Sequence, residues 1–99
     1  MKSKYLGKKV IVRGDRSGVF FGTLEEKQGS EVRLTDCRQL WYWEGAAAVN
    51  QLALDGTMKP EGCKFTVIVK SLEISDCIEI IPCTKEAIKS IESVKTWKL

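Results

Sequence analysis

The chain contains no histidine. Histidine is the most common general base in enzymes and completes the Ser-His and Cys-His nucleophile pairs, so those mechanisms are excluded. No glycine pattern of the Walker or dinucleotide-binding type is present either. Adjacent acids such as Glu25 and Glu26 point to opposite faces of a strand and carry no catalytic signature. We therefore expect a protein that is not an enzyme and that uses no cofactor; an enzyme based on a carboxylate or a lysine is the alternative.

The chain also lacks any Cys-x-x-Cys pair. Its four cysteines are irregularly spaced, at Cys37, Cys63, Cys77 and Cys83. Zinc sites normally use regularly spaced cysteine and histidine ligands, so we predict no metal site. Without an export signal disulfides are not expected, and the thiols are interpreted as small apolar side chains of the interior.

Long apolar runs are missing as well. No stretch approaches the ~20 apolar residues that a membrane-spanning helix needs. The first residues, MKSKYLGKKVIV, are basic, but the apolar run that follows is too short for a signal peptide. We expect no membrane contact and a cytoplasmic protein. A length of 99 residues predicts a single domain over residues 1–99.

The charge is mildly positive and unevenly distributed. The net charge is +3, and residues 1–50 hold 9 basic and 6 acidic residues against 7 of each in residues 51–99. The excess therefore lies in the first half, where it can attract a partner that carries phosphate. A solvated surface is the other interpretation. The charge is too small to predict specific binding of DNA or RNA.

Short runs of β-branched and aromatic residues, separated by glycine-containing turns, predict a sheet in the first half. The expected strands span residues 8–13, 19–25, 31–35 and 40–43. A helix is expected over residues 45–54, with Gly56 ending it. The composition of these segments favours a small antiparallel sheet or a partial SH3-like barrel.

The second half predicts two further strands and a short C-terminal helix. Residues 64–70 form an apolar run, and even-spaced apolar residues continue over residues 72–80 with a break at Asp76. Pro82 ends this strand, and Thr84 caps a helix over residues 85–93. The predicted class is therefore α+β, with one central helix and one short C-terminal helix.

The segment over residues 38–44, RQLWYWE, is the most unusual in the chain. In a strand Trp41 and Trp43 share one face and Tyr42 points to the other. Aromatic rings can stack on nucleobases, and Arg38 can bind phosphate through two parallel hydrogen bonds. Packing in the core or between subunits is the alternative interpretation of the same segment.

Two other segments can contribute to a binding site. The turn GDRSG over residues 14–18 can present consecutive amides to an anion, with Arg13 and Arg16 beside it. Asn50 and Gln51, on the expected central helix, have side-chain amides that can read the polar edge of a base. The alternative for the turn is an ordinary connection between strands. The alternative for Asn50 and Gln51 is exposure to solvent on the helix.

Several motifs resemble those of small phage and prophage proteins. They are LTDCRQLWYWEGAAAVNQLALDG over residues 34–56, CKF over 63–65, IEIIP over 78–82 and the final Trp97-Lys98. Within that group the chain is similar to the Thoeris anti-defence proteins, which sequester immune signals of the cyclic ADP-ribose type. The resemblance implies a phage-encoded protein that binds and sequesters a cyclic nucleotide or ADP-ribose-type molecule, without cleaving it, in the infected bacterial host.

Together these observations predict a ligand site. Its expected residues are Arg13, Arg16 and Arg38 for phosphate, Trp41 or Trp43 for the base, and Asn50 and Gln51 for polar edges. The alternative function is a protein-binding inhibitor of a bacterial defence complex, similar to an anti-CRISPR protein. We also expect a homo-oligomer, because 3 Trp, 3 Phe and 2 Tyr leave aromatic surface that one small core does not cover.

Overall fold

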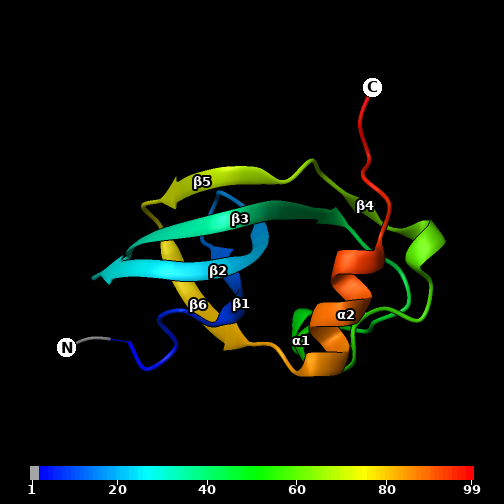
Figure 1. Ribbon diagram of the computed structural model, residues 1–99, viewed down its shortest axis with the longest axis horizontal. Coiled ribbons are helices and arrows are strands. Elements are labelled where there is room, and N and C mark those ends of the chain that lie inside the picture. The colour runs from blue at the N-terminus through cyan, green and yellow to red at the C-terminus, as the bar shows by residue number, and fades with distance from the viewer. Residues whose placement is uncertain (1–2) are drawn as a thin grey trace.

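The computed structural model describes residues 3–99 and shows an α+β fold, as predicted (Figure 1). The elements, in chain order, are β1 (Lys9–Gly14), β2 (Val19–Gln28), β3 (Glu31–Tyr42), α1 (Val49–Asp55), the 3-10 helix η1 (Pro60–Gly62), β4 (Lys64–Phe65), β5 (Val69–Ile74), β6 (Cys77–Pro82) and α2 (Lys85–Ser93). The strands form one antiparallel sheet in the order β4-β3-β2-β1-β6, with β5 also paired to β3.

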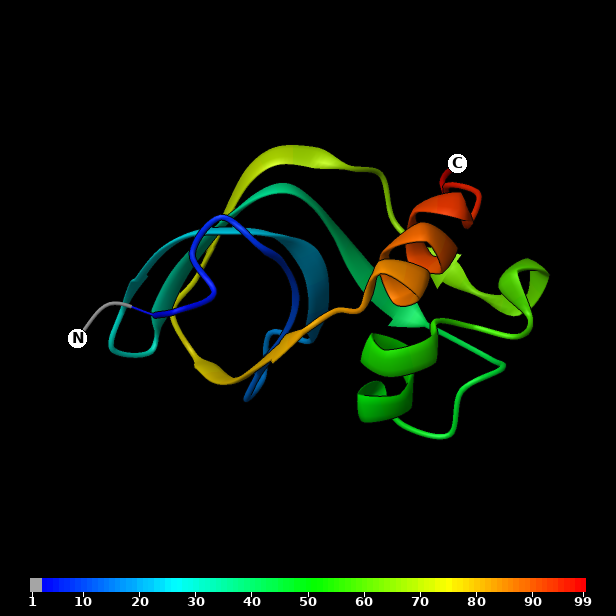
Figure 2. The same cartoon turned by 60° about the horizontal axis from the view of Figure 1, so that its bottom comes forward.

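The sheet is curled into a partial barrel. β1 lies between β2 and the last strand, β6, and the long β3 pairs with β2 on one side and with β5 and β4 on the other. Figure 2 looks into the curl, which appears as an open ring of strands with the helices beside it on the right. Within residues 3–99 no ladder joins β5 to β6, so the barrel is open between them.

Both faces of the curled sheet are buried at β1. In β1, Val10 and Val12 face the barrel interior, whereas Ile11 belongs to a second core beneath the helices. Burial on both faces explains why β1 is apolar at successive positions instead of alternating. The second core contains residues from β1, β2, β3, β4 and both helices, so it fixes the helical layer onto the sheet.

Local signals for the helix ends are confirmed. The side chain of Thr84 accepts a hydrogen bond from the backbone N–H of Ala87 at 3.1 Å, and α2 spans the predicted residues. Gly56 follows α1 with a φ of 78°, a conformation that glycine adopts without strain. α1 is shorter than predicted and begins at Val49. None of the helices in residues 3–99 has the length and apolar character to cross a membrane.

Several strand boundaries differ from the prediction, and β2 continues to Gln28, three residues past its expected end. The strands expected over residues 31–35 and 40–43 are one strand, β3, which continues past Asp36 although this residue has a positive φ of 48°. The strand expected over residues 64–70 is divided into β4 and β5. Thr66 lies at the division, where its hydroxyl accepts a hydrogen bond from the N–H of Gln39 at 2.8 Å. The expected break at Asp76 and the end at Pro82 are both confirmed.

Candidate aromatic binding site

Two tryptophans stack on each other at one end of the sheet. The ring centroids of Trp41, near the end of β3, and Trp97, in the segment after α2, are 4.8 Å apart with 23° between the ring planes. Trp41 is 55% exposed and Trp97 is 44% exposed. The pair therefore presents aromatic surface to solvent.

A lysine lies beside this pair. The Nζ atom of Lys64 is 5.6 Å from the ring centroids of both Trp41 and Trp97 and 6.0 Å from that of Tyr42. Lys64 reaches this position because its backbone pairs with Tyr42 where β4 joins β3. An ammonium near aromatic rings is attracted by their negative faces. We define Trp41, Trp97 and Lys64 as the aromatic site.

Backbone contacts hold Trp97 in place. Its N–H donates to the carbonyl oxygen of Phe65 at 2.8 Å, and Thr96 forms a parallel bridge with Phe65. In Figure 1 the chain after α2 runs up beside β4 before it ends. A short segment added to the edge of β4 thus supplies half of the stacked pair. We did not predict this role for Trp97, since spacing along the chain does not link it to residue 41.

Arg38 lies beneath this region and is only 3% exposed. Its guanidinium donates to the carbonyl oxygens of Phe65 at 3.3 Å and Thr66 at 3.1 Å. It also donates to those of Ile91 at 3.2 Å and Val94 at 3.0 Å. The expectation that Arg38 is an exposed phosphate contact is therefore wrong. Four of its five N–H groups bind the chain's own backbone.

The surroundings of Arg38 explain how a charge is tolerated there. Desolvation by burial lowers the pKa of the Arg38 guanidinium, yet arginine keeps its proton in proteins. The carbonyls of Ile91 and Val94 lie at the end of α2, where the helix dipole is negative, and the Phe65 ring lies 5.5 Å from the guanidinium carbon. Arg38 therefore ties the end of α2 to β4.

Comparison with protein families identifies the family of this chain. A family model matches residues 7–91, which include all of the strands and most of α2. The chain belongs to DUF6948, a domain of unknown function. No curated protein and no solved structure matches it. Trp41 and Lys64 lie within the DUF6948 match, and Trp97 follows it.

The turn over residues 14–18 of the DUF6948 domain does present amides to an anion, but that anion belongs to the chain. The Asp76 carboxylate accepts hydrogen bonds from the N–H of Arg16 at 2.8 Å, the N–H of Ser17 at 3.0 Å and the Ser17 hydroxyl at 2.6 Å. The hydrogen bond from the Ser17 side chain is the main reason that the pKa of Asp76 is lowered. The nearby Arg13 pairs with Glu79, with Nε and Oε1 3.2 Å apart.

The remaining predicted residues have separate environments. Trp43 is half-buried and packs against the core beneath the helices, so it does not share the exposed face of Trp41. The Gln51 side chain accepts a hydrogen bond from the N–H of Ala47 at 2.7 Å. Asn50 is exposed on α1. Of the seven predicted residues, Trp41 is the one that belongs to the aromatic site.

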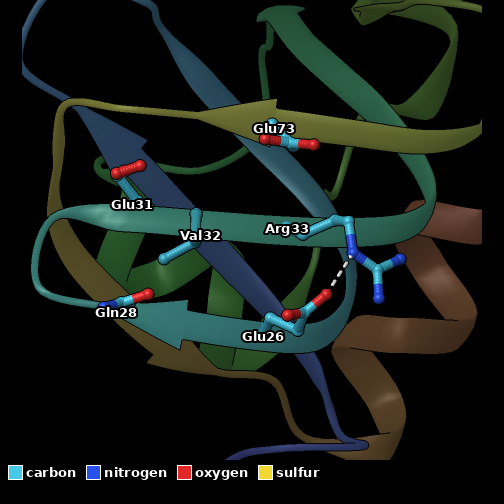
Figure 3. Close-up of a pocket in the computed structure, with 6 residues that line it drawn as sticks. All are labelled: Glu26, Gln28, Glu31, Val32, Arg33 and Glu73. Atoms are coloured by element: carbon cyan, nitrogen blue, oxygen red, sulfur yellow. Dashed lines mark hydrogen bonds and ion pairs between the residues drawn. The ribbon is translucent and has the colours of Figure 1, made fainter.

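One recess adjoins the aromatic site: it has about 160 Å³ and is lined by Trp97, Lys98 and Leu99. The other recesses lie elsewhere. A pocket of about 200 Å³ is formed by side chains of β2, β3 and β5 (Figure 3): Glu26, Gln28, Glu31, Val32, Arg33 and Glu73. Arg33 pairs there with Glu26 at 2.7 Å. The volume is below the ~300–1,000 Å³ of typical ligand pockets. Among residues 3–99, no group of three or more Cys, Asp and Glu side chains is placed to bind a metal ion.

The four cysteines are free thiols. Cys37 is fully buried in the barrel core, as predicted, whereas the other three are partly exposed. Burial raises the pKa of both Cys37 and Cys83 to about 12. Cys63 lines a recess of about 380 Å³ beside η1, together with Pro60, Glu61, Ser93 and Lys95.

Proposed function

We propose that the protein is a non-catalytic binding module that holds a nucleotide-type ligand, with a planar base and at least one phosphate, on the aromatic site. The observation that carries this proposal is the stacked and exposed pair of Trp41 and Trp97 with an ammonium 5.6 Å from both rings. An exposed indole face can stack a base, and Lys64 can bind the phosphate of the same ligand.

The expected affinity of one copy is modest. Stacking contributes ~1–3 kcal/mol per base, and a hydrogen bond between charged groups about 1.5–3 kcal/mol. The sum, ~2.5–6 kcal/mol, corresponds to a Kd between roughly 40 μM and 15 mM. Further contacts with sugar or with a second phosphate would tighten binding beyond this range.

The resemblance to phage anti-defence proteins supports a biological setting for such binding. In this proposal the ligand is an immune signal of the cyclic nucleotide or ADP-ribose type, which the protein sequesters without cleavage inside the infected bacterial host. Sequestration requires only that the ligand is held, so a chain without histidine can perform it.

The test is equilibrium dialysis of the protein against cyclic ADP-ribose and a panel of cyclic dinucleotides, followed by heat release and mass analysis of the ligand. The proposal predicts uptake of at least one of these ligands and its intact release. Degraded ligand would contradict a binding-only function. Lys64→Gln should weaken uptake, while Lys70→Gln, which removes an exposed lysine from β5, serves as the matched control.

A second candidate, the protein-binding inhibitor, is favoured by one observation. Val67, Ile68 and Val69 are 43%, 57% and 38% exposed and follow β4 directly in the chain. An exposed run of branched apolar residues is typical of a protein interface. If folded protein takes up no ligand in the dialysis experiment, this candidate replaces the first.

A further inference from the structure

We infer that residues 94–97 assemble the aromatic site and that Arg38 is the positioning residue that holds them against β4. The effect that we expect on ligand affinity rests on the proposed function. The effect that we expect on the stacking of the two rings does not. The other contacts of this segment are weak. Lys95, Thr96 and Trp97 are all exposed, and their ladder to β4 is one isolated bridge at Thr96.

A single bridge between short, exposed segments is marginally stable by itself. Stacking of Trp97 on Trp41 adds to it, but one aromatic pair does not by itself order a chain end. A stronger constraint is needed to keep the two rings together. The buried residue just before this segment is Val94, which is 4% exposed and belongs to the core beneath the helices.

Arg38 connects the two sides that must stay together. On one side its guanidinium binds the carbonyls of Phe65 and Thr66, and on the other side those of Ile91 and Val94. One planar group therefore fixes the separation between β4 and the end of α2. A lysine at this position has its donors at a single atom and cannot reproduce this arrangement.

The contacts of Arg38 and Trp97 also meet at one atom. The carbonyl oxygen of Phe65 accepts from the Arg38 guanidinium at 3.3 Å and from the Trp97 N–H at 2.8 Å. Any shift of Phe65 that follows a change at Arg38 therefore moves the acceptor of Trp97. This shared acceptor gives a direct route from a buried cation to an exposed ring.

The test compares Arg38→Lys with Arg33→Lys. Both arginines lie on β3, but Arg33 binds Glu26 at the surface, away from the segment after α2. Two stacked indoles produce an exciton couplet in far-ultraviolet circular dichroism, and Trp97→Ala assigns that couplet by removing one ring. Arg38→Lys should lose the couplet. It should also bind ligand roughly tenfold more weakly, because a loss of ~1.4 kcal/mol of stacking corresponds to a factor of ten in affinity. Arg33→Lys should change neither.

An unchanged couplet in folded Arg38→Lys would overturn the inference. If Arg38→Lys does not fold, the double variant Lys95→Gly and Thr96→Gly loosens the link between Val94 and Trp97 and keeps Arg38. It should lose the couplet too. A retained couplet would show that Trp97 docks independently of its link to Val94, which Arg38 binds, and would overturn the inference. A lost couplet with unchanged ligand affinity would support the positioning role and contradict the proposed ligand site.

Discussion

The carboxylate of Asp76 accepts a hydrogen bond from the hydroxyl of Ser17 at 2.6 Å, across 59 residues of sequence. The same loop contact includes the N–H groups of Arg16 and Ser17, and the N–H of Asp15 donates to the Asp76 carbonyl at 2.9 Å. These bonds join the turn before β6 to the turn between β1 and β2. They close one end of the sheet at the point where β6 pairs with β1.

This contact predicts a dependence of stability on pH. Because the pKa of Asp76 is lowered in the folded state, its contribution is present above its ordinary value of 3.8 and is lost as the pH falls through the folded pKa. Asp76→Asn should therefore be less stable than the wild type at neutral pH, and the difference should shrink in acid. Denaturant unfolding at neutral and acidic pH measures this. Asp15→Asn is the control, and a constant difference would argue against the prediction.

Removal of the Arg38 side chain should strongly destabilise the fold. Arg38→Ala removes four buried hydrogen bonds, which predicts a loss of about 3 kcal/mol or more in the free energy of unfolding. The carbonyls of Phe65 and Ile91 keep a second donor, the N–H of Trp97 and of Val94. Arg33→Ala breaks an exposed ion pair and should cost at most about 1 kcal/mol. Urea unfolding of both variants tests this. An equal loss of unfolding free energy in the two variants would show that the buried hydrogen bonds of Arg38 stabilise the fold no more than an exposed ion pair does.

The two tryptophans of residues 38–44, Trp41 and Trp43, should respond differently to replacement by alanine. Trp43 is half-buried against the helical-side core, so Trp43→Ala should lower the free energy of unfolding by about 2–4 kcal/mol. Trp41 is 55% exposed, and Trp41→Ala should cost no more than ~1.5 kcal/mol, the value of its stacking contact. Thermal and urea unfolding decide between this ranking and the reverse, which would place Trp41 in the core.

Thiol reactivity should follow burial. With a pKa of about 12, Cys37 and Cys83 are protonated at about pH 8, so both should resist iodoacetamide in the native protein. Peptide mass analysis locates the label, and the same reaction in denaturant shows that the thiols are intact. Rapid native labelling of Cys37 would contradict its place in the barrel core.

Sequence reasoning predicted the parts of the fold that depend on neighbouring residues. As expected, α2 is capped by Thr84, α1 ends at Gly56 and β6 ends at Pro82. Each of these residues affects only the element next to it in the chain. The continuity of β3 was missed because the clear alternation of apolar residues ends at residue 35, whereas partners on both sides keep the strand extended past Asp36. The division between β4 and β5 depends on the contact of Thr66 with Gln39, which lies 27 residues away.

The site was predicted less well, for a physical reason. Residue type suggested that Arg38 binds phosphate, but the fold supplies carbonyl acceptors from β4 and α2 that lie far from it in sequence. Trp41 was identified by its aromatic neighbours. Its partner Trp97 is 4.8 Å away only because the chain after α2 returns to β4, and no local pattern indicates that return.

The most direct test of the aromatic site is the ligand affinity of wild type, Trp41→Ala and Trp97→Ala, measured by equilibrium dialysis with the nucleotide that the wild type takes up best. Melting temperatures of the same samples show whether each variant is folded. Both variants should remain folded and bind about tenfold or more weakly, because each loses a stacking surface worth ~1–3 kcal/mol. Wild-type affinity in both folded variants would contradict the account.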